Sequence, residues 1–217
     1  MKKILFSVLF FVSFFLLGQD FYVLSKNGLN LRKAPSDKSE ILGVVPYNTK
    51  LNILEKNVSE KFKVNGFSGT YVKIKYKGIV GYIFSGFLSR LEAVKEEESL
   101  EEYFIRVFGK PVITKSDDEL FSDDIWTYPN GFVYKSIGEA SKYSGYEDRY
   151  YFKDLTIQEV FLFARDISGF LNSIRDTSEL KFECENGCDF ETEEGLYNGY
   201  SLKKESGVII LTDFGEI

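Results

Sequence analysis

A short run with a strict two-residue period constrains the fold more than any other feature of the sequence. In residues 71–78 the apolar side chains of Val72, Ile74 and Tyr76 alternate with lysines at positions 73, 75 and 77. This is the period of a β-strand with one face on a core and the other in water. The lysine face either attracts an anionic partner or is a solvated face that discourages edge pairing.

Further strands are expected on both sides of this run. Leu29 and Leu31 alternate with Asn30 and Arg32, and Pro35 ends that strand because it has no N–H to donate. Apolar segments and turn residues predict the remaining strands at residues 21–24, 41–45, 49–55 and 79–84, a long loop over 33–40 and a polar insertion over 56–68.

The order of these motifs resembles the bacterial SH3 (SH3b) domain over residues 20–88. The resemblance rests on Leu29-Asn30-Leu31-Arg32, Pro35-Ser36, Gly43, and residues 76–83 followed by Phe87-Leu88. The chain departs from the family at Tyr71, where tryptophan is frequent, and in the insertion. The resemblance implies a strongly bent antiparallel barrel that binds a peptide or a cell-wall stem peptide in a shallow groove, without catalysis.

Five residues are candidates for lining this groove: Asn30, Arg32, Ser36, Tyr71 and Tyr82. Tyrosine offers a flat apolar ring with a polar tip, and arginine offers a forked donor for the carboxylates of a peptide. The alternative is that these residues form ordinary barrel surface and core rim.

The N-terminal residues 1–18 predict an export signal. Lys2 and Lys3 precede an apolar run over 4–17, and Gly18 is a small residue for cleavage. The run is about 14 residues long, whereas a membrane-spanning helix needs about 20. An uncleaved membrane anchor is the alternative. We therefore expect a periplasmic, cell-envelope or secreted protein.

Charge divides the rest of the chain into two halves. Residues 19–92 hold 12 basic and 6 acidic side chains, whereas residues 93–217 hold 13 basic and 27 acidic ones. Such asymmetry indicates two domains and permits electrostatic docking of one on the other. We expect a barrel over 19–91, an exposed charged linker over 92–99 and an α+β domain over 100–217.

The second domain is expected to contain two helices laid on antiparallel strands. Ser99 and Glu102 form a capping box before an amphipathic run that ends at Gly109. Thr156 and Glu159 repeat this pattern before a helix expected to run to position 171, with a strand over 157–163 as the rival. Strands are expected at residues 112–114, 125–128, 132–136, 180–184, 197–203 and 208–212, an order that suggests two similar units.

Two short motifs in this domain, Phe108-Gly109-Lys110-Pro111 and Trp126-Thr127-Tyr128-Pro129-Asn130-Gly131, resemble small envelope modules of the SmpA or β-lactamase-inhibitor-protein type. Those modules bind and assemble proteins. The resemblance implies a non-enzymatic role for the second domain.

The chain offers little for catalysis, because it contains no histidine. Histidine-based general bases, nucleophilic pairs and metal sites are thereby excluded. Cys184 and Cys188 flank an Asn-Gly turn, which predicts a disulfide across a hairpin. The acidic groups at 117–119, 123–124 and 147–148 lack the spacing of a calcium loop and are expected to be surface charge.

We therefore expect a non-catalytic exported binding protein with no cofactor and no bound metal. Its expected partner is a peptide, a peptidoglycan fragment or an envelope protein, and not nucleic acid. One alternative is a surface or assembly protein that holds its partner through the acidic second domain. A less favoured alternative is a cell-wall glycosidase with paired carboxylates.

Overall fold

The structure is a computed structural model that describes residues 20–56, 58–115, 121–139, 145–167, 182, 187–191 and 199–216. The predicted export signal, the acidic group at 117–119, Cys184 and most of the predicted strand 180–184 lie outside these residues, so the disulfide stays a prediction. Among the described residues, no helix has the length and apolar character needed to cross a membrane.

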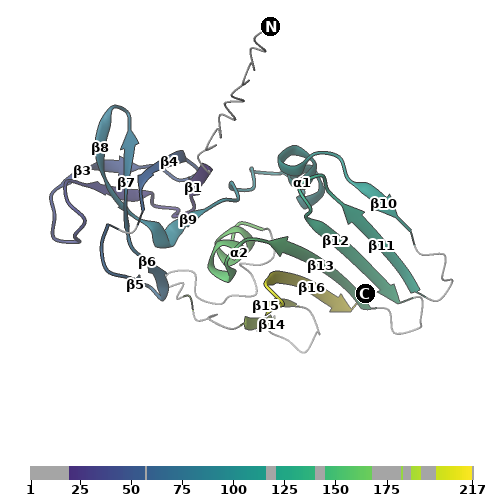
Figure 1. Cartoon of the computed structure of the whole chain (residues 1–217). Helices are drawn as coiled ribbons and strands as arrows, with labels where there is room; N and C mark the ends of the chain where they lie inside the picture. Colours follow the sequence, from purple (N-terminus) through teal and green to yellow (C-terminus); the bar gives the residue numbers. More distant parts are fainter. Residues whose placement is uncertain are drawn as a thin grey trace, which may run out of the picture.

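The N-terminal domain, residues 20–91, is a seven-stranded antiparallel sheet in the order β3-β2-β8-β7-β4-β1-β9 (Figure 1). Its inner face carries a small aliphatic core that includes Leu31, Val72, Ile74 and Ile83. The two-residue periods predicted these residues, and the SH3-like β domain is confirmed. The strands are β1 (Asp20–Val23), β2 (Leu29–Arg32), β3 (Ile41–Val45), β4 (Lys50–Glu55), β7 (Tyr71–Tyr76), β8 (Ile79–Phe84) and β9 (Leu88–Ser89), with a 3-10 turn at Ser85–Phe87.

The segment 56–68 is not the purely polar insertion that the sequence suggested. It contains a hairpin of β5 (Phe62–Val64) and β6 (Phe67–Gly69). Asn65 and Gly66 form the turn with φ of 49° and 80°, a conformation that this residue pair adopts readily. Phe67 is fully buried. Asn65-Gly66 is a hairpin-turn signal in the sequence, but the neighbouring lysines made the segment read as a polar loop.

The C-terminal domain is built on a second seven-stranded sheet in the order β10-β11-β12-β13-β16-β15-β14. All pairings are antiparallel. The strands are β10 (Val112–Thr114), β11 (Phe121–Thr127), β12 (Val133–Glu139), β13 (Gly145–Lys153), β14 (Gly187–Glu191), β15 (Gly199–Glu205) and β16 (Val208–Glu216).

Strand β13 was missed, because its aromatic and charged residues occur on both faces and hide the period. Gly187 begins β14 opposite Lys203, so it is a strand residue and not part of the predicted turn. With two helices and many strands among its described residues, the domain supports the α+β prediction only in part.

Both predicted helices form, and each begins at a complete capping box. Ser99 and Glu102 cap α1 (Leu100–Phe108), and Thr156 and Glu159 cap α2 (Ile157–Ala164). The described helix α2 ends well before position 171. The amides of Asp166 and Ile167 donate to carbonyls three residues earlier, which tightens the last turn.

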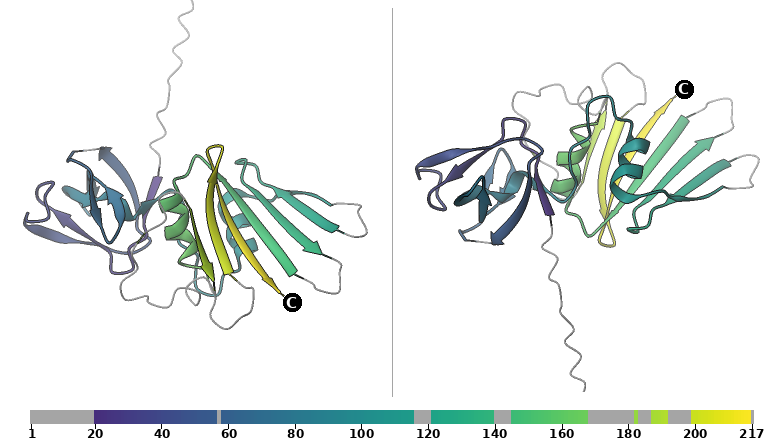
Figure 2. Two further views of the ribbon diagram at one scale, coloured as in Figure 1. Left: turned by 90° about the horizontal axis from the view of Figure 1, so that it is seen from below. Right: turned by 90° about the horizontal axis from the view of Figure 1, so that it is seen from above.

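Helix α1 precedes β10–β13, and helix α2 precedes β14–β16. The two sets of strands run inward from the sheet edges and meet at the β13–β16 pair, with β10–β13 on one side and β14–β16 on the other. The Phe152 ring contacts Phe104 of α1 and Phe163 of α2, at centroid distances of 6.4 and 5.8 Å. Both helices therefore cover the same face of the sheet (Figure 2), an arrangement that agrees with two similar units.

Helix α2 also lies against the N-terminal domain. Arg90 donates two hydrogen bonds through its guanidinium to the carboxylate of Glu159, from Nε at 2.7 Å and from Nη2 at 2.6 Å. Gln158 exchanges two hydrogen bonds with the Ser68 backbone, at 2.8 and 3.0 Å, and donates a third to the Gly86 carbonyl. Breaking a buried pair such as Arg90–Glu159 costs about 3–5 kcal/mol, because it leaves one charge uncompensated.

A second group of contacts extends this interface. Lys26 pairs with Asp166 at 2.6 Å, and Arg165 donates to the Leu24 carbonyl. The ring of Phe67 lies 5.9 Å from that of Phe161 and 5.3 Å from that of Phe182. Basic groups of the N-terminal domain thus meet acidic groups of the C-terminal domain, as the charge asymmetry permitted, around a shared aromatic cluster.

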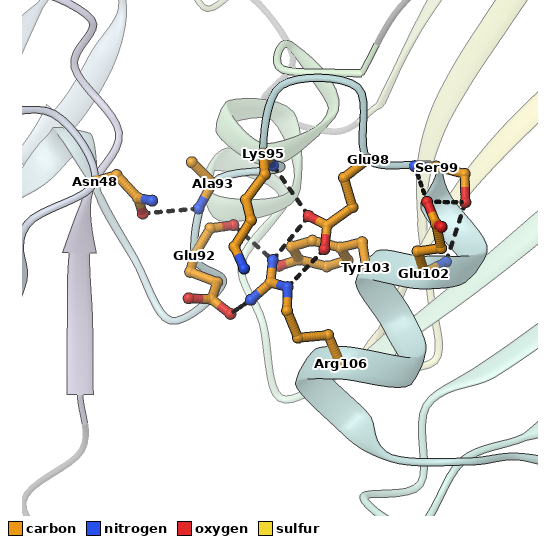
Figure 3. A network of polar contacts seen from close by, with 9 residues as sticks. All are labelled: Asn48, Glu92, Ala93, Lys95, Glu98, Ser99, Glu102, Tyr103 and Arg106. Atoms are coloured by element: carbon orange, nitrogen blue, oxygen red, sulfur yellow. Dashed lines mark hydrogen bonds and ion pairs between the residues drawn. The ribbon is translucent and has the colours of Figure 1, made fainter.

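The connection between the domains is charged but not simply exposed (Figure 3). Ala93 is buried, and its amide donates to the side-chain oxygen of Asn48 at 3.0 Å. Arg106 of α1 binds Glu92 and Glu98, and its guanidinium lowers the pKa of Glu98 to about 2. The predicted exposed linker over 92–99 is therefore held on α1, because one arginine satisfies two of its carboxylates.

Candidate functional site

A row of side chains crosses four strands on the outer face of the N-terminal sheet. Arg32 in β2 pairs with Tyr82 in β8, Tyr82 pairs with Lys73 in β7, and Lys73 pairs with Glu55 in β4. Residues directly opposite in antiparallel strands point to the same side. Lys73 Nζ lies 6.0 Å from the centre of the Tyr82 ring and 3.8 Å from the Glu55 carboxylate.

Exposed aliphatic side chains flank this row. Ile41 lies opposite Arg32, Val44 lies opposite Asn30, and Val80 lies opposite Lys75. The three aliphatic residues are 46–51% exposed. We call this surface the basic aromatic face; it consists of Asn30, Arg32, Ile41, Val44, Lys73, Lys75, Val80 and Tyr82.

The basic aromatic face places cations, one flat ring and apolar contacts side by side. Strands β2, β3, β7 and β8 lie on the side of the domain away from α2 (Figure 1). The guanidinium of Arg32 uses Nη1 to donate to the Ser39 carbonyl at 2.8 Å. An arginine with its fork partly free next to a tyrosine ring suits a carboxylate on a peptide-like ligand.

Tyr71 does not belong to the exposed part of this face. It points to the same side as Lys73, but it is only 5% exposed, because its ring lies 5.3 Å from that of Phe62, which in turn contacts Phe84. Burial raises the pKa of Tyr71, and Arg32 opposes that shift. Tyr71 is therefore mostly buried beside the exposed part of this face, and a role in lining the groove stays a prediction.

Ser36 lies in the loop between β2 and β3. It is exposed, and its Oγ accepts a hydrogen bond from the Lys38 amide at 3.3 Å. The Arg32 and Ala34 contacts to Ser39 hold the base of this loop. Of the five predicted groove residues, Asn30, Arg32 and Tyr82 thus share the open face, while Ser36 lies in the adjoining loop.

Sequence reasoning did not select Ile41, Val44 and Val80 as site residues. Single β-branched residues in a strand are normally part of a core. The strand register shows that these three point outward, since Val44 lies opposite Asn30 and Val80 lies opposite Lys75. Ile41 comes opposite Arg32 only through the irregularity between Leu31 and Arg32 in the β2–β3 pairing. Among the described residues, no group of histidine, cysteine, aspartate or glutamate is suited to hold a metal ion.

Comparison with known proteins agrees with the N-terminal fold. Residues 27–89 match the family model described as the bacterial SH3 domain. No curated protein and no solved structure matches the chain. The match covers the N-terminal domain alone and suggests a binding module; the predicted resemblance of the C-terminal domain to SmpA-type modules has no support from these comparisons.

Proposed function

We propose that the protein is an exported, non-catalytic binding protein of the cell envelope whose basic aromatic face holds a peptide-like or cell-wall ligand. The observation that carries the proposal is the row of Arg32, Tyr82 and Lys73 beside three exposed aliphatic side chains. Cations bind the carboxylates of such a ligand, and the ring and aliphatic groups contact its apolar side chains.

The absence of histidine supports a role without catalysis, because it removes histidine-based general bases and nucleophilic pairs. Among the described residues, no group of histidine, cysteine, aspartate or glutamate is suited to hold a metal ion that could replace them.

Retention on insoluble peptidoglycan, with soluble muropeptides as competitors, tests the proposal. We expect the wild-type chain to be retained, and Tyr82→Ala combined with Lys73→Gln to lose about tenfold or more in affinity, because a ring contact and a charged contact are both removed. Lys61→Gln is the matched control, since it removes one exposed charge outside the face. Equal retention of the double variant and the control contradicts the proposal.

A second candidate function is protein binding through the C-terminal sheet. The face opposite the helices carries a depression of about 550 Å³ lined by residues that include Arg149, Tyr151 and Phe214. The edge strand β10 exposes Val112 and Ile113, at 72% and 51%. Crosslinking in cells separates the two functions: a stable protein partner without wall fragments favours the second.

A further inference from the structure

A separate cavity lies between the N-terminal end of α1 and strands β11–β13, on the helix-covered face of the C-terminal sheet. Its volume is about 180 Å³. Trp126, Tyr134 and Tyr150 form its floor as a stack across three strands, with ring centroids 4.5 and 4.9 Å apart. Leu100, Glu101, Phe104 and Tyr128 complete the lining.

Carboxylates surround this aromatic floor on two sides. Glu101 in the first turn of α1 lines the cavity, and it makes no hydrogen bond or ion pair with another described residue. Two residues further along the strands on the same face, Asp124, Ser136, Asp148 and Asp213 lie in register across β11, β12, β13 and β16. We call the three aspartates of this set the acid row. The Tyr134 hydroxyl donates to Asp148 Oδ1 at 2.9 Å, which links the floor to that row.

Positive charge is scarce in this region. The cavity lining contains no lysine or arginine among the described residues. Lys115, whose side chain is 75% exposed, forms an ion pair with Asp124 at 3.9 Å. Neither Asp148 nor Asp213 forms an ion pair with a described residue, and burial together with the neighbouring Asp148 raises the pKa of Asp213 to about 6. Two opposed carboxylates repel one another when both are ionised.

We propose that this aromatic cavity binds an organic cation, an alkylammonium or guanidinium group. Five aromatic rings line the cavity, those of the stack together with Phe104 and Tyr128, and aromatic rings attract such cations most strongly where both are removed from water. Glu101 supplies a counter-charge at the α1 side, and the acid row supplies a negative potential from the other. The cavity is too small for a sugar chain, and it fits the end of one side chain. Beyond α1 the strands β11–β13 extend uncovered by helix (Figure 2), so a longer ligand has room to continue over the acid row.

Trp126 makes the proposal directly measurable, because it is the only tryptophan of the chain. Its fluorescence in the full-length protein is titrated with Nα-acetyl-arginine amide and with the citrulline analogue, which is nearly isosteric but neutral. We expect a saturable change with the arginine compound, weakened by salt, and little change with the citrulline compound. An equal response to both shows a purely apolar pocket and overturns the proposal.

Variants identify the groups that act on the cation. We expect Glu101→Gln to weaken binding about threefold, whereas Glu96→Gln removes a charge from an exposed position and leaves binding unchanged. Tyr134→Phe keeps the ring and is expected to retain binding within about twofold, and Tyr134→Leu is expected to lose about fivefold. Thermal unfolding verifies that each variant is folded. Equal affinities of the Glu101 and Glu96 variants contradict the assignment.

Two further probes distinguish the sources of the cation. If the site serves a polypeptide, a short glycine-flanked arginine peptide binds more tightly than the blocked amino acid. If it serves a small metabolite, the free amine agmatine binds more tightly than the peptide. If the arginine peptide, agmatine and the blocked arginine compound all fail to bind, the proposed cation site is rejected. The proposal for the basic aromatic face is not affected by that result, because the two sites share no residue.

Discussion

The two domains differ in how they bury their apolar surface. The N-terminal domain encloses a core of aliphatic residues such as Leu31, Val72 and Ile83. The C-terminal domain relies on phenylalanine and tyrosine rings, and its cluster continues into the N-terminal domain through Phe67 and other residues of the shared interface. The first core belongs to one domain, whereas the second joins both. The chain therefore holds the basic aromatic face in a fixed relation to the C-terminal sheet.

The largest test of this comparison is Phe67→Ala. Removal of a fully buried ring from the shared cluster is expected to cost about 3–5 kcal/mol. Because the ring touches both domains, urea unfolding is expected to change from one transition to two. Val64→Ala in the same hairpin is 37% exposed in the parent and serves as control. A single transition shifted equally by both substitutions shows that the domains are not joined at Phe67.

Arg90→Gln is expected to have the next largest effect, a loss of about 3 kcal/mol in the free energy of unfolding. The substitution leaves the Glu159 carboxylate without its charged partner, and the Glu159 side chain is only 9% exposed. Lys33→Gln breaks the Lys33–Glu40 pair, whose side chains are 68% and 63% exposed, and is expected to cost less than about 1 kcal/mol. Chemical denaturation measures both. Equal losses for the two pairs mean that the interface pair is solvated.

Gly81→Ala tests the N-terminal domain alone. A Cβ at Gly81 falls 2.7 Å from the Arg32 carbonyl and 2.8 Å from the Leu31 side chain, so strands β2 and β8 have to separate. We expect a loss of about 1–3 kcal/mol. Gly43→Ala places its Cβ in open space and is the matched control. If both variants unfold at the same denaturant concentration, the close approach of β2 and β8 is wrong.

Asp213→Asn is expected to produce the smallest effect and a pH dependence of known sign. The folded state raises the pKa of Asp213 from 3.8 to about 6, so it holds the proton more tightly than the unfolded chain does. Stability from this group is present at low pH and is lost as pH rises from 3.8 to about 6. The free energy of unfolding of the variant should therefore exceed that of the parent above pH 6 and match it near pH 4. The difference above pH 6 is expected to be about 1 kcal/mol, because partial solvation of Asp213 reduces the effect of the full pKa shift. Unfolding free energies measured at both pH values check this, and a difference that is larger at pH 4 contradicts it.

The elements that could be predicted from sequence are those whose signal is local. The period of residues 71–76 and the capping boxes at Ser99 and Thr156 need only neighbouring residues, and each produced a correct element. Strand β13 was not predicted because both of its faces mix aromatic and charged residues: Asp148 shares a face with Tyr150, and Arg149 shares the other with Tyr151.

The candidate site was predicted in part for the same reason. Asn30, Arg32 and Tyr82 follow from strand alternation, whereas the outward direction of Ile41 depends on a pairing irregularity that no local pattern reveals. Tyr71 points to the same side as Lys73, but Phe62 contacts its ring. Phe62 belongs to the β5–β6 hairpin, which was not predicted from the sequence. Contacts between distant segments decide both cases.

The most direct test of the proposed function is a backbone amide NMR titration of the full-length protein with a soluble muropeptide. Binding at the basic aromatic face predicts that the amides of Asn30, Arg32, Lys73 and Tyr82 shift together and saturate at one concentration, while those of β10–β16 stay in place. Shifts confined to the C-terminal sheet, or no shifts at muropeptide concentrations that release the protein from cell walls, would contradict the assignment of the ligand to this face.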